Sequence, residues 1–247
     1  MITSPENPRI REVVRLRKGR ERRAAGVFLA EGRREVERAF AAGLAVREVF
    51  VAPALLPGWT PDGDTTVTEV TPRVLAKLSY RDEPEGVLAV VDVPTRSIPE
   101  DATLILVAVA IEKPGNLGAM ARSAAAAGAD ALLVADAECD PWNPNAIRAS
   151  TGAVFTLPVL ETTLDDVARL DVQRVAAVVD AGTSYTDADL TPPTALVVGA
   201  EDTGLDDRWR ALADVEVSIP VRAAPIDSLN ASAAAAVLLY ESLRQRG

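Results

Sequence analysis

Three short segments of this chain place small polar side chains beside glycine or at the start of a helix. The first, residues 112–122, reads Glu-Lys-Pro-Gly-Asn-Leu-Gly-Ala-Met-Ala-Arg and follows an apolar run. The second is Gly-Ala-Glu-Asp-Thr-Gly at 199–204, and the third is Ser-Leu-Asn at 228–230. Turns from a strand into a helix offer backbone N–H groups and short polar side chains to a ligand. Glycine-bearing loops after parallel strands are also where α/β proteins bind their ligands.

In the first segment, Asn116 and Arg122 are the residues suited to chemistry. We expect a helix over 116–127, with Asn116 as its cap and glycines that allow a tight turn before it. Arg122 lies about 9 Å further along the axis, and its side chain points back toward the helix start. Both can therefore serve one binding site. The alternatives are a plain helix cap for Asn116 and a surface or ion-paired arginine for Arg122.

The other two segments carry Glu201, Ser228 and Asn230. The loop at 199–204 lacks the Gly-Lys-Ser/Thr ending of a phosphate-binding P-loop, and it is no Gly-x-Gly-x-x-Gly fingerprint. A nucleoside triphosphatase or an NAD enzyme is therefore disfavoured. For Ser228 the simplest alternative is a helix cap, with Asn230 in the first turn of a helix over 228–246.

Composition excludes several chemistries. The chain has no histidine and one cysteine, Cys139. This argues against the usual zinc sites, a histidine-based triad and a disulfide framework. We expect an inert Cys139, no metal and a reducing cytoplasm. No apolar leader opens the chain, and its longest apolar run, 104–111, is far shorter than the ~20 residues of a membrane helix.

Charge is unevenly distributed. The net charge of −10 alone argues against nucleic acid as a partner. Residues 9–23, the basic segment, nevertheless contain only two glutamates against eight basic residues: Arg9, Arg11, Arg15, Arg17, Lys18, Arg20, Arg22 and Arg23. A local cluster of this kind can bind phosphates while the remaining surface stays acidic. We favour a phosphate-facing surface over a merely solvated helix face.

The order of elements predicts two α/β domains. Residues 1–93 form the first domain, 94–101 a linker and 102–247 the second domain. In the first we expect strands at 27–30, 46–51, 66–70 and 86–91, and helices at 8–18, 32–42 and 72–78. In the second we expect strands or extended segments at 104–111, 131–135, 155–160, 174–179, 195–199 and 215–219, and helices at 116–127, 143–150, 164–170 and 228–246.

Taken in order, these motifs resemble the SpoU/TrmH family of RNA ribose 2′-O-methyltransferases. The pattern is N-x-G-x-x-x-R, then G-x-E-x-x-G, then Ile-Pro followed by Ser-Leu-Asn before a last helix, and it spans about 104–246. The stretch 148–159, Arg-Ala-Ser-Thr-Gly-Ala-Val-Phe-Thr-Leu-Pro-Val, is similar to the middle segment of the family. Residues 3–8 and 28–32 more weakly resemble its N-terminal substrate-binding domain.

The resemblance implies a parallel-sheet catalytic domain with a deep C-terminal trefoil knot, behind a smaller α/β RNA-binding domain. It also implies S-adenosylmethionine as the cofactor and a homodimer formed through the knotted domain, with no membrane or metal partner. The implied cofactor contacts are Gly199, Ala200, Glu201, Gly204, Ile219, Pro220, Ser228 and Leu229. The basic segment, in particular Arg9, Arg15, Arg17, Lys18, Arg20, Arg22 and Arg23, would bind RNA.

By the same resemblance, Arg122 matches the arginine assigned to the proton of the ribose hydroxyl. A guanidinium normally stays protonated, so Arg122 either acts as a perturbed base or positions phosphate and hydroxyl. Asn116, Glu201, Ser228 and Asn230 would shape the catalytic site around it. The chain departs from the family at Lys113, where an acidic residue is frequent. Ribosomal RNA is favoured over transfer RNA as the substrate, and an RNA methyltransferase is favoured over a non-catalytic RNA-binding relative or a Rossmann-type nucleotide enzyme.

Overall fold

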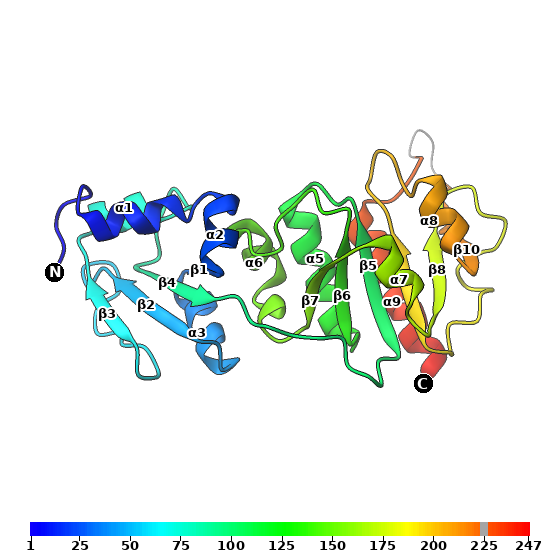
Figure 1. Cartoon of the computed structure of the whole chain (residues 1–247), viewed down its shortest axis with the longest axis horizontal. Helices are drawn as coiled ribbons and strands as arrows, with labels where there is room; N and C mark the ends of the chain where they lie inside the picture. The colour runs from blue at the N-terminus through cyan, green and yellow to red at the C-terminus, as the bar shows by residue number, and fades with distance from the viewer. Residues whose placement is uncertain (223–226) are drawn as a thin grey trace. The chain divides into compact units, whose positions relative to one another are not determined.

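The computed structural model describes residues 1–222 and 227–247, and the chain forms two compact units (Figure 1). Unit 1 comprises Met1–Thr95 and Trp142–Phe155, and unit 2 comprises Arg96–Pro141 and Thr156–Gly247. The helix expected at 143–150, which sequence reasoning placed in the second domain, is α6 (Pro144–Ser150) and belongs to unit 1. The chain therefore passes between the units more than once, and 94–101 is one of several connections.

Unit 1 is built on a mixed sheet in the order β1-β4-β2-β3. The pairs β1–β4 and β4–β2 are antiparallel, and β2–β3 is parallel. Its strands are β1 (Val27–Glu31), β2 (Val46–Val51), β3 (Thr66–Glu69) and β4 (Val87–Asp92). Its helices are α1 (Pro8–Arg15), α2 (Gly19–Ala25), α3 (Arg33–Ala41), α4 (Pro72–Leu78) and α6, followed by the 3-10 turn η1 (Ala153–Phe155).

Both faces of this sheet are covered. On one face, apolar residues of α1 and α4 such as Ile10 and Leu75 join Leu29 and Phe50 in a buried core. On the other face, the ring of Phe28 stacks on Trp142 and Phe155, with ring centroids 4.9 and 5.4 Å apart. These rings fasten the α6 segment to β1, as expected for aromatic side chains that bury large apolar surfaces.

Unit 2 is built on a parallel sheet in the order β10-β8-β9-β5-β6-β7. Its strands are β5 (Leu104–Val109), β6 (Ala131–Ala135), β7 (Val159–Thr162), β8 (Gln173–Ala177), β9 (Thr194–Val198) and β10 (Val215–Val217). The central strands β5, β6 and β9 are buried along their whole length. This is the burial expected of a parallel sheet covered by helices on both faces.

The helices of unit 2 are α5 (Pro114–Ala126), α7 (Leu164–Ala168), α8 (Asp207–Leu212) and α9 (Ala231–Arg246). Helices α5 and α9 pack against each other, and α9 also packs on β9. Alternate side chains of the strands, such as Ile105 and Val107, form a core with Val167 of α7 and Trp209 of α8. Because successive strand residues point to opposite faces, α5 and α9 cover one face while α7 and α8 cover the other.

The sequence pattern missed two helices, α2 and α8. Helix α2 is rich in arginine and alanine and has no apolar repeat, and α8 is only six residues long. A capping residue starts α8, since Asp206 accepts hydrogen bonds from the backbone N–H groups of Arg208 and Trp209. The extended segment expected at 155–160 is shifted, since Phe155 ends η1 and the strand β7 covers Val159–Thr162. Such short elements fall below the length at which periodicity is informative.

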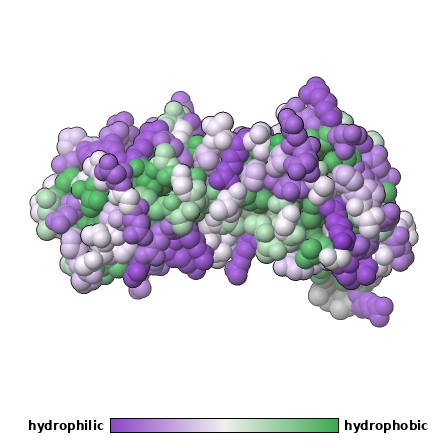
Figure 2. Space-filling model, turned by 90° about the horizontal axis from the view of Figure 1, so that it is seen from below, coloured by the Kyte–Doolittle hydropathy of each residue, from purple (hydrophilic) through white to green (hydrophobic). Residues whose placement is uncertain are grey.

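The surface is mixed in character. On the face drawn in Figure 2, hydrophilic and hydrophobic side chains are interspersed. Within residues 1–222 and 227–247, no helix has the length and apolar character needed to cross a bilayer. In the same residues, no three histidine, cysteine or carboxylate side chains gather in a way that could hold a metal ion.

Candidate active site

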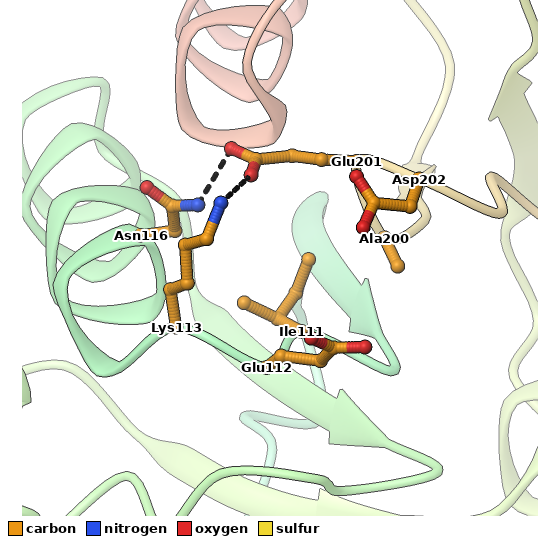
Figure 3. A pocket seen from close by; sticks show the side chains of 7 residues that line it. All are labelled: Ile111, Glu112, Lys113, Asn116, Ala200, Glu201 and Asp202. Carbon is orange, nitrogen blue, oxygen red and sulfur yellow. Dashed lines mark hydrogen bonds and ion pairs between the residues drawn. The ribbon is translucent and has the colours of Figure 1, made fainter.

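The candidate site lies where the strand order of unit 2 changes direction. From β5 the chain moves outward to β6 and β7, whereas β9 is followed by β10 at the opposite edge of the sheet. Ligands of open α/β sheets bind beyond the carboxyl ends of two such strands. A small pocket of about 20 Å³ that opens to solvent lies there (Figure 3), lined by Ile111, Glu112, Lys113, Asn116, Ala200, Glu201 and Asp202.

The loop after β9 is closed on itself. The N–H of Gly204 donates to the carbonyl of Ala200 at 3.0 Å, and Gly204 has a φ of +66°, a conformation that favours glycine. A Cβ atom on Gly199 would lie 2.4 Å from the carbonyl carbon and oxygen of Gly204. Both glycines are therefore required by the loop itself, which projects Glu201 over the pocket.

Asn116, Glu201 and Asn230 form one hydrogen-bonded group, here called the amide–carboxylate cluster. The side-chain amide of Asn116 donates to Glu201 Oε1 at 2.7 Å, and the amide of Asn230 donates to the same oxygen. The Asn230 amide also donates to Asn116 Oδ1 at 3.2 Å. Three segments that are distant in sequence thus meet at one carboxylate.

Two capping predictions were wrong, and the corrections explain the cluster. Helix α5 begins at Pro114 with Lys113 at the cap position, so Asn116 is inside the first turn and its amide is available to Glu201. The last helix begins at Ala231 rather than at Ser228. Its cap is Asn230, whose Oδ1 accepts from the backbone N–H groups of Ser232 and Ala233 at 3.0 and 3.3 Å.

Lys113 completes the surroundings of Glu201. Its ammonium donates to Glu201 Oε2 at 2.7 Å. The hydrogen bond from Lys113, followed by its charge and the Asn116 amide, lowers the pKa of Glu201 below its ordinary value despite partial burial. The Glu201 hydrogen bond correspondingly raises the pKa of Lys113. The cluster is therefore built around an ionised carboxylate at neutral pH.

Arg122 lies outside the amide–carboxylate cluster. It is exposed on α5, and six residues correspond to a rotation of about 240° around a helix from Asn116. Within the part of the chain that the structure describes, no hydrogen bond or ion pair joins Arg122 to Asn116, Glu201 or Asn230. Arg122 therefore has no direct bond to the cluster, and the prediction that it serves the same binding site as Asn116 stays a prediction.

The remaining predicted cofactor residues follow β10 and precede α9. Ile219 is half-buried, whereas Pro220, Ser228 and Leu229 are exposed. Ala200 is half-buried at the rim of the pocket. Residues 223–226, which lie between these two groups and include Pro225, are outside the described part of the chain.

The basic segment is heterogeneous. Arg22 is only 2% exposed, and its guanidinium donates to the carbonyls of Leu16 and Arg17, so it is a core residue and not part of an RNA-facing surface. Arg9 is paired with Glu12 and Glu48. Arg17 lies over the ring of Tyr80, 5.3 Å from its centroid. The exposed cations of the segment are Arg11, Arg15, Lys18, Arg20 and Arg23, of which Arg11 pairs with Glu6.

Sequence reasoning missed the ion pair between Lys113 and Glu201. The two residues are 88 positions apart. A signal was present, because Lys113 departs from the acidic residue that is frequent in the resembled family before the Pro-Gly turn.

Comparison with known proteins matches both units. Residues 103–240 match the model of the SpoU rRNA Methylase family, and residues 7–89 match the MRM3-like substrate binding domain. The 23S rRNA (uridine(2479)-2′-O)-methyltransferase of Streptomyces viridochromogenes is 36% identical over 247 aligned positions, which cover 92% of this chain and 85% of that protein.

Solved structures agree with these matches. The SpoU methyltransferase AviRb from Streptomyces viridochromogenes, in complex with AdoMet, superimposes with a TM-score of 0.88 at 31% identity over 98% of both chains. The crystal structure of an RNA 2′-O ribose methyltransferase has a TM-score of 0.84 at 43% identity, covering 99% of this chain and 98% of the other. Because the family model matches residues 103–240, which are more than half of the chain, this chain belongs to the SpoU rRNA Methylase family.

Proposed function

We propose that the protein is an S-adenosylmethionine-dependent methyltransferase that modifies a ribose 2′-hydroxyl of ribosomal RNA. The amide–carboxylate cluster is the observation that carries this proposal. It joins the three family motifs at the switch point of a parallel sheet, where α/β proteins bind their ligands. Relatives named as 23S rRNA 2′-O-methyltransferases favour ribosomal over transfer RNA.

The residues around the end of β10 fit the cofactor. Val221 and Leu229 are both more than a third exposed, although they are apolar, and Ile219, two residues before Val221, is half-buried. Such side chains suit an adenine ring, while backbone groups at Ala200 and Ile219 can satisfy its polar edge. Gly199, Glu201, Gly204, Pro220 and Ser228 are proposed to complete the site. S-adenosylmethionine, when bound, supplies an electrophilic methyl group.

The protein side chains are proposed to orient the reacting ribose. Arg122, as a protonated guanidinium, would bind phosphate and stabilise negative charge that develops on the 2′-oxygen. The amide–carboxylate cluster would hold the loops of the site in fixed positions relative to one another. Ser228, exposed close to Asn230, is proposed to contact substrate or cofactor directly.

A homodimer would explain both the exposed position of Arg122 and the character of α9. Within α9, Tyr240 and Leu243 are 50% and 42% exposed, while Leu238 and Leu239 are fully buried. A helix that is apolar on more than one side is normally covered on more than one side. We propose that a second copy covers this face through a knotted C-terminal domain, and that Arg122 of one subunit completes the site of the other.

The RNA-binding role is assigned to unit 1, whose residues 7–89 match a substrate binding domain. The exposed cations Arg15, Lys18, Arg20 and Arg23, together with Arg9 and Arg17, are proposed to contact phosphates. The proposed substrate-binding domain is 1–93 and the proposed methyltransferase domain is 102–247 without the segment 142–155, which belongs to unit 1, and 94–101 is the linker between them. A ribosomal RNA substrate would place the protein in the cytoplasm.

The decisive experiment is tritium transfer from labelled S-adenosylmethionine to ribosomal and transfer RNA isolated from cells that lack the gene. We expect label in ribosomal RNA, located on a ribose by resistance of the adjacent phosphodiester to alkali. Label in transfer RNA alone would change the substrate assignment. Tight RNA binding without transfer to any cellular RNA would identify a non-catalytic relative and refute the proposal.

A further inference from the structure

Lys113 stands out among the described residues that line the pocket, because it is the one basic side chain beside Glu112, Glu201 and Asp202. Its side chain is 68% exposed, yet its ammonium is directed at Glu201 Oε2. Figure 3 shows Lys113 and Asn116 converging on the Glu201 carboxylate from the start of α5, whereas Glu112 is turned away from it.

The two oxygens of Glu201 are divided between two kinds of donor. Oε1 accepts from the amides of Asn116 and Asn230, and Oε2 accepts from Lys113. Binding at one oxygen alone leaves the carboxylate free to rotate, whereas donors on both oxygens fix its plane. The plane in turn fixes the amides, because a carboxylate accepts only from their N–H groups and so directs Asn116 Oδ1 toward Asn230.

We propose that Lys113 is a positioning residue for methyl transfer, whose ammonium holds the Glu201 carboxylate so that the Asn116 and Asn230 amides keep one orientation over the pocket. This inference rests on the proposed function. Lys113 acts through Glu201 and not on the substrate. Its ion pair links the start of α5 to the closed loop after β9, and Glu201 links that loop to the start of α9 through Asn230.

The charges around Glu201 make this role dependent on pH. The groups that contact the carboxylate are Lys113 and Asn230, at the cap positions of α5 and α9, and Asn116 in the first turn of α5, while Glu112 and Asp202 are the other charged groups that line the pocket. Lys113 is the largest influence that lowers the pKa of Glu201. A carboxylate with a lowered pKa keeps its contacts above its ordinary pKa and loses them as the pH falls through the lowered value. Without Lys113 that loss occurs at a higher pH.

The test compares Lys113→Met and Lys113→Arg with the control Lys77→Met, which removes an exposed lysine of α4 in unit 1. We expect Lys113→Met to lower kcat about tenfold, to move the acid limb of the kcat profile to higher pH and to leave KM for RNA within about twofold. Lys113→Arg should restore most of kcat, and Lys77→Met should match the wild type. A loss confined to KM, with a flatter salt dependence, would identify a phosphate contact and overturn the proposal.

A second readout needs neither cofactor nor RNA. The side-chain carboxyl of Glu201 is titrated by ¹³C NMR in the wild type and in Lys113→Met, with Glu201→Gln used to assign the resonance. The expected result is a higher midpoint in Lys113→Met, and an unchanged midpoint would overturn the proposal. Absence of methyl transfer by the wild type would refute the proposed function. The titration would still show whether Lys113 holds the Glu201 carboxylate, so the two failures can be distinguished.

Discussion

The amide–carboxylate cluster of unit 2 and the basic segment of unit 1 use polar side chains in opposite ways. In the cluster, the partners are 85 and 114 residues apart in sequence and bind one another. In the basic segment, the cations are neighbours in sequence but have separate partners, for example Glu48 for Arg9 and Glu6 for Arg11. Methyl transfer should be lost when one member of the shared network is removed. RNA binding, in contrast, should weaken gradually as the separate charges of the basic segment are removed.

The largest effect on methyl transfer is expected at Arg122, which within the described residues is bonded neither to the amide–carboxylate cluster nor to the basic segment. Arg122→Ala should lower methyl transfer about 1,000-fold, because a donor aimed at developing negative charge is lost. Binding of S-adenosylmethionine, measured by calorimetry, should change little. The matched control is Arg169→Ala, which removes another exposed arginine of unit 2 that pairs only locally, with Asp166 at 3.0 Å. Wild-type turnover in Arg122→Ala would remove this residue from the mechanism.

Gly199→Ala should be the next most damaging change. The added Cβ would lie 2.4 Å from the Gly204 carbonyl, so the loop that carries Glu201 must open. We expect a stability loss of about 1–3 kcal/mol, as for overpacking elsewhere, and a fall in activity of about 100-fold from displacement of Glu201. Gly182→Ala is the control, because a Cβ there meets no atom within 4 Å. Equal behaviour of the two variants in thermal melts and methyl-transfer assays would contradict this account of the loop.

Asn230→Ala separates capping from catalysis. Asn230 caps α9 and donates to Glu201, whereas Asn143 caps α6 and has no place in the cluster. Both alanine variants should lose about 1 kcal/mol of stability through the missing cap. Only Asn230→Ala should also lower methyl transfer, by about tenfold or more. Chemical denaturation and single-turnover assays give the two quantities, and comparable activity in both variants would reduce Asn230 to a structural cap.

These residues show which features of the fold and the site can be predicted from the sequence and which cannot. The buried central strand β5 followed from the apolar run 104–111, because a fully buried strand leaves a continuous signature, whereas the parallel sheet was implied by the family resemblance. The motifs also identified Asn116, Glu201 and Asn230 as members of one site. Their bonding could not be predicted, because a first-turn asparagine and a capping asparagine look alike in sequence. Asn116 was therefore taken for the cap that it is not, and Asn230 for a first-turn residue.

Arg22 makes the same point for unit 1. Composition groups it with its exposed neighbours, but its guanidinium is buried and bonded to the carbonyls of Leu16 and Arg17. Whether a cation faces solvent depends on the turn between α1 and α2, and the missing apolar repeat concealed α2. Local charge density predicts a surface, whereas packing decides which of its members are accessible.

The smallest effect, and the most graded, is expected from the basic segment. Neutralising Arg15, Arg17 and Arg20 to glutamine should weaken RNA binding several-fold and flatten the slope of log K against log salt by about 2, since each single-strand phosphate contact contributes about 0.7. The control replaces three other arginines with glutamine and so removes the same charge. These are Arg33, Arg47 and Arg169, which are paired with Glu37, Asp92 and Asp166.

If the two triple variants give the same slope in filter-binding titrations, the basic segment acts only through net charge. If the slope falls only in the first, these side chains contact phosphates, and each single arginine should account for about a third of the change. The cluster should show no such proportionality, and that difference is what separates a shared network from a row of independent charges.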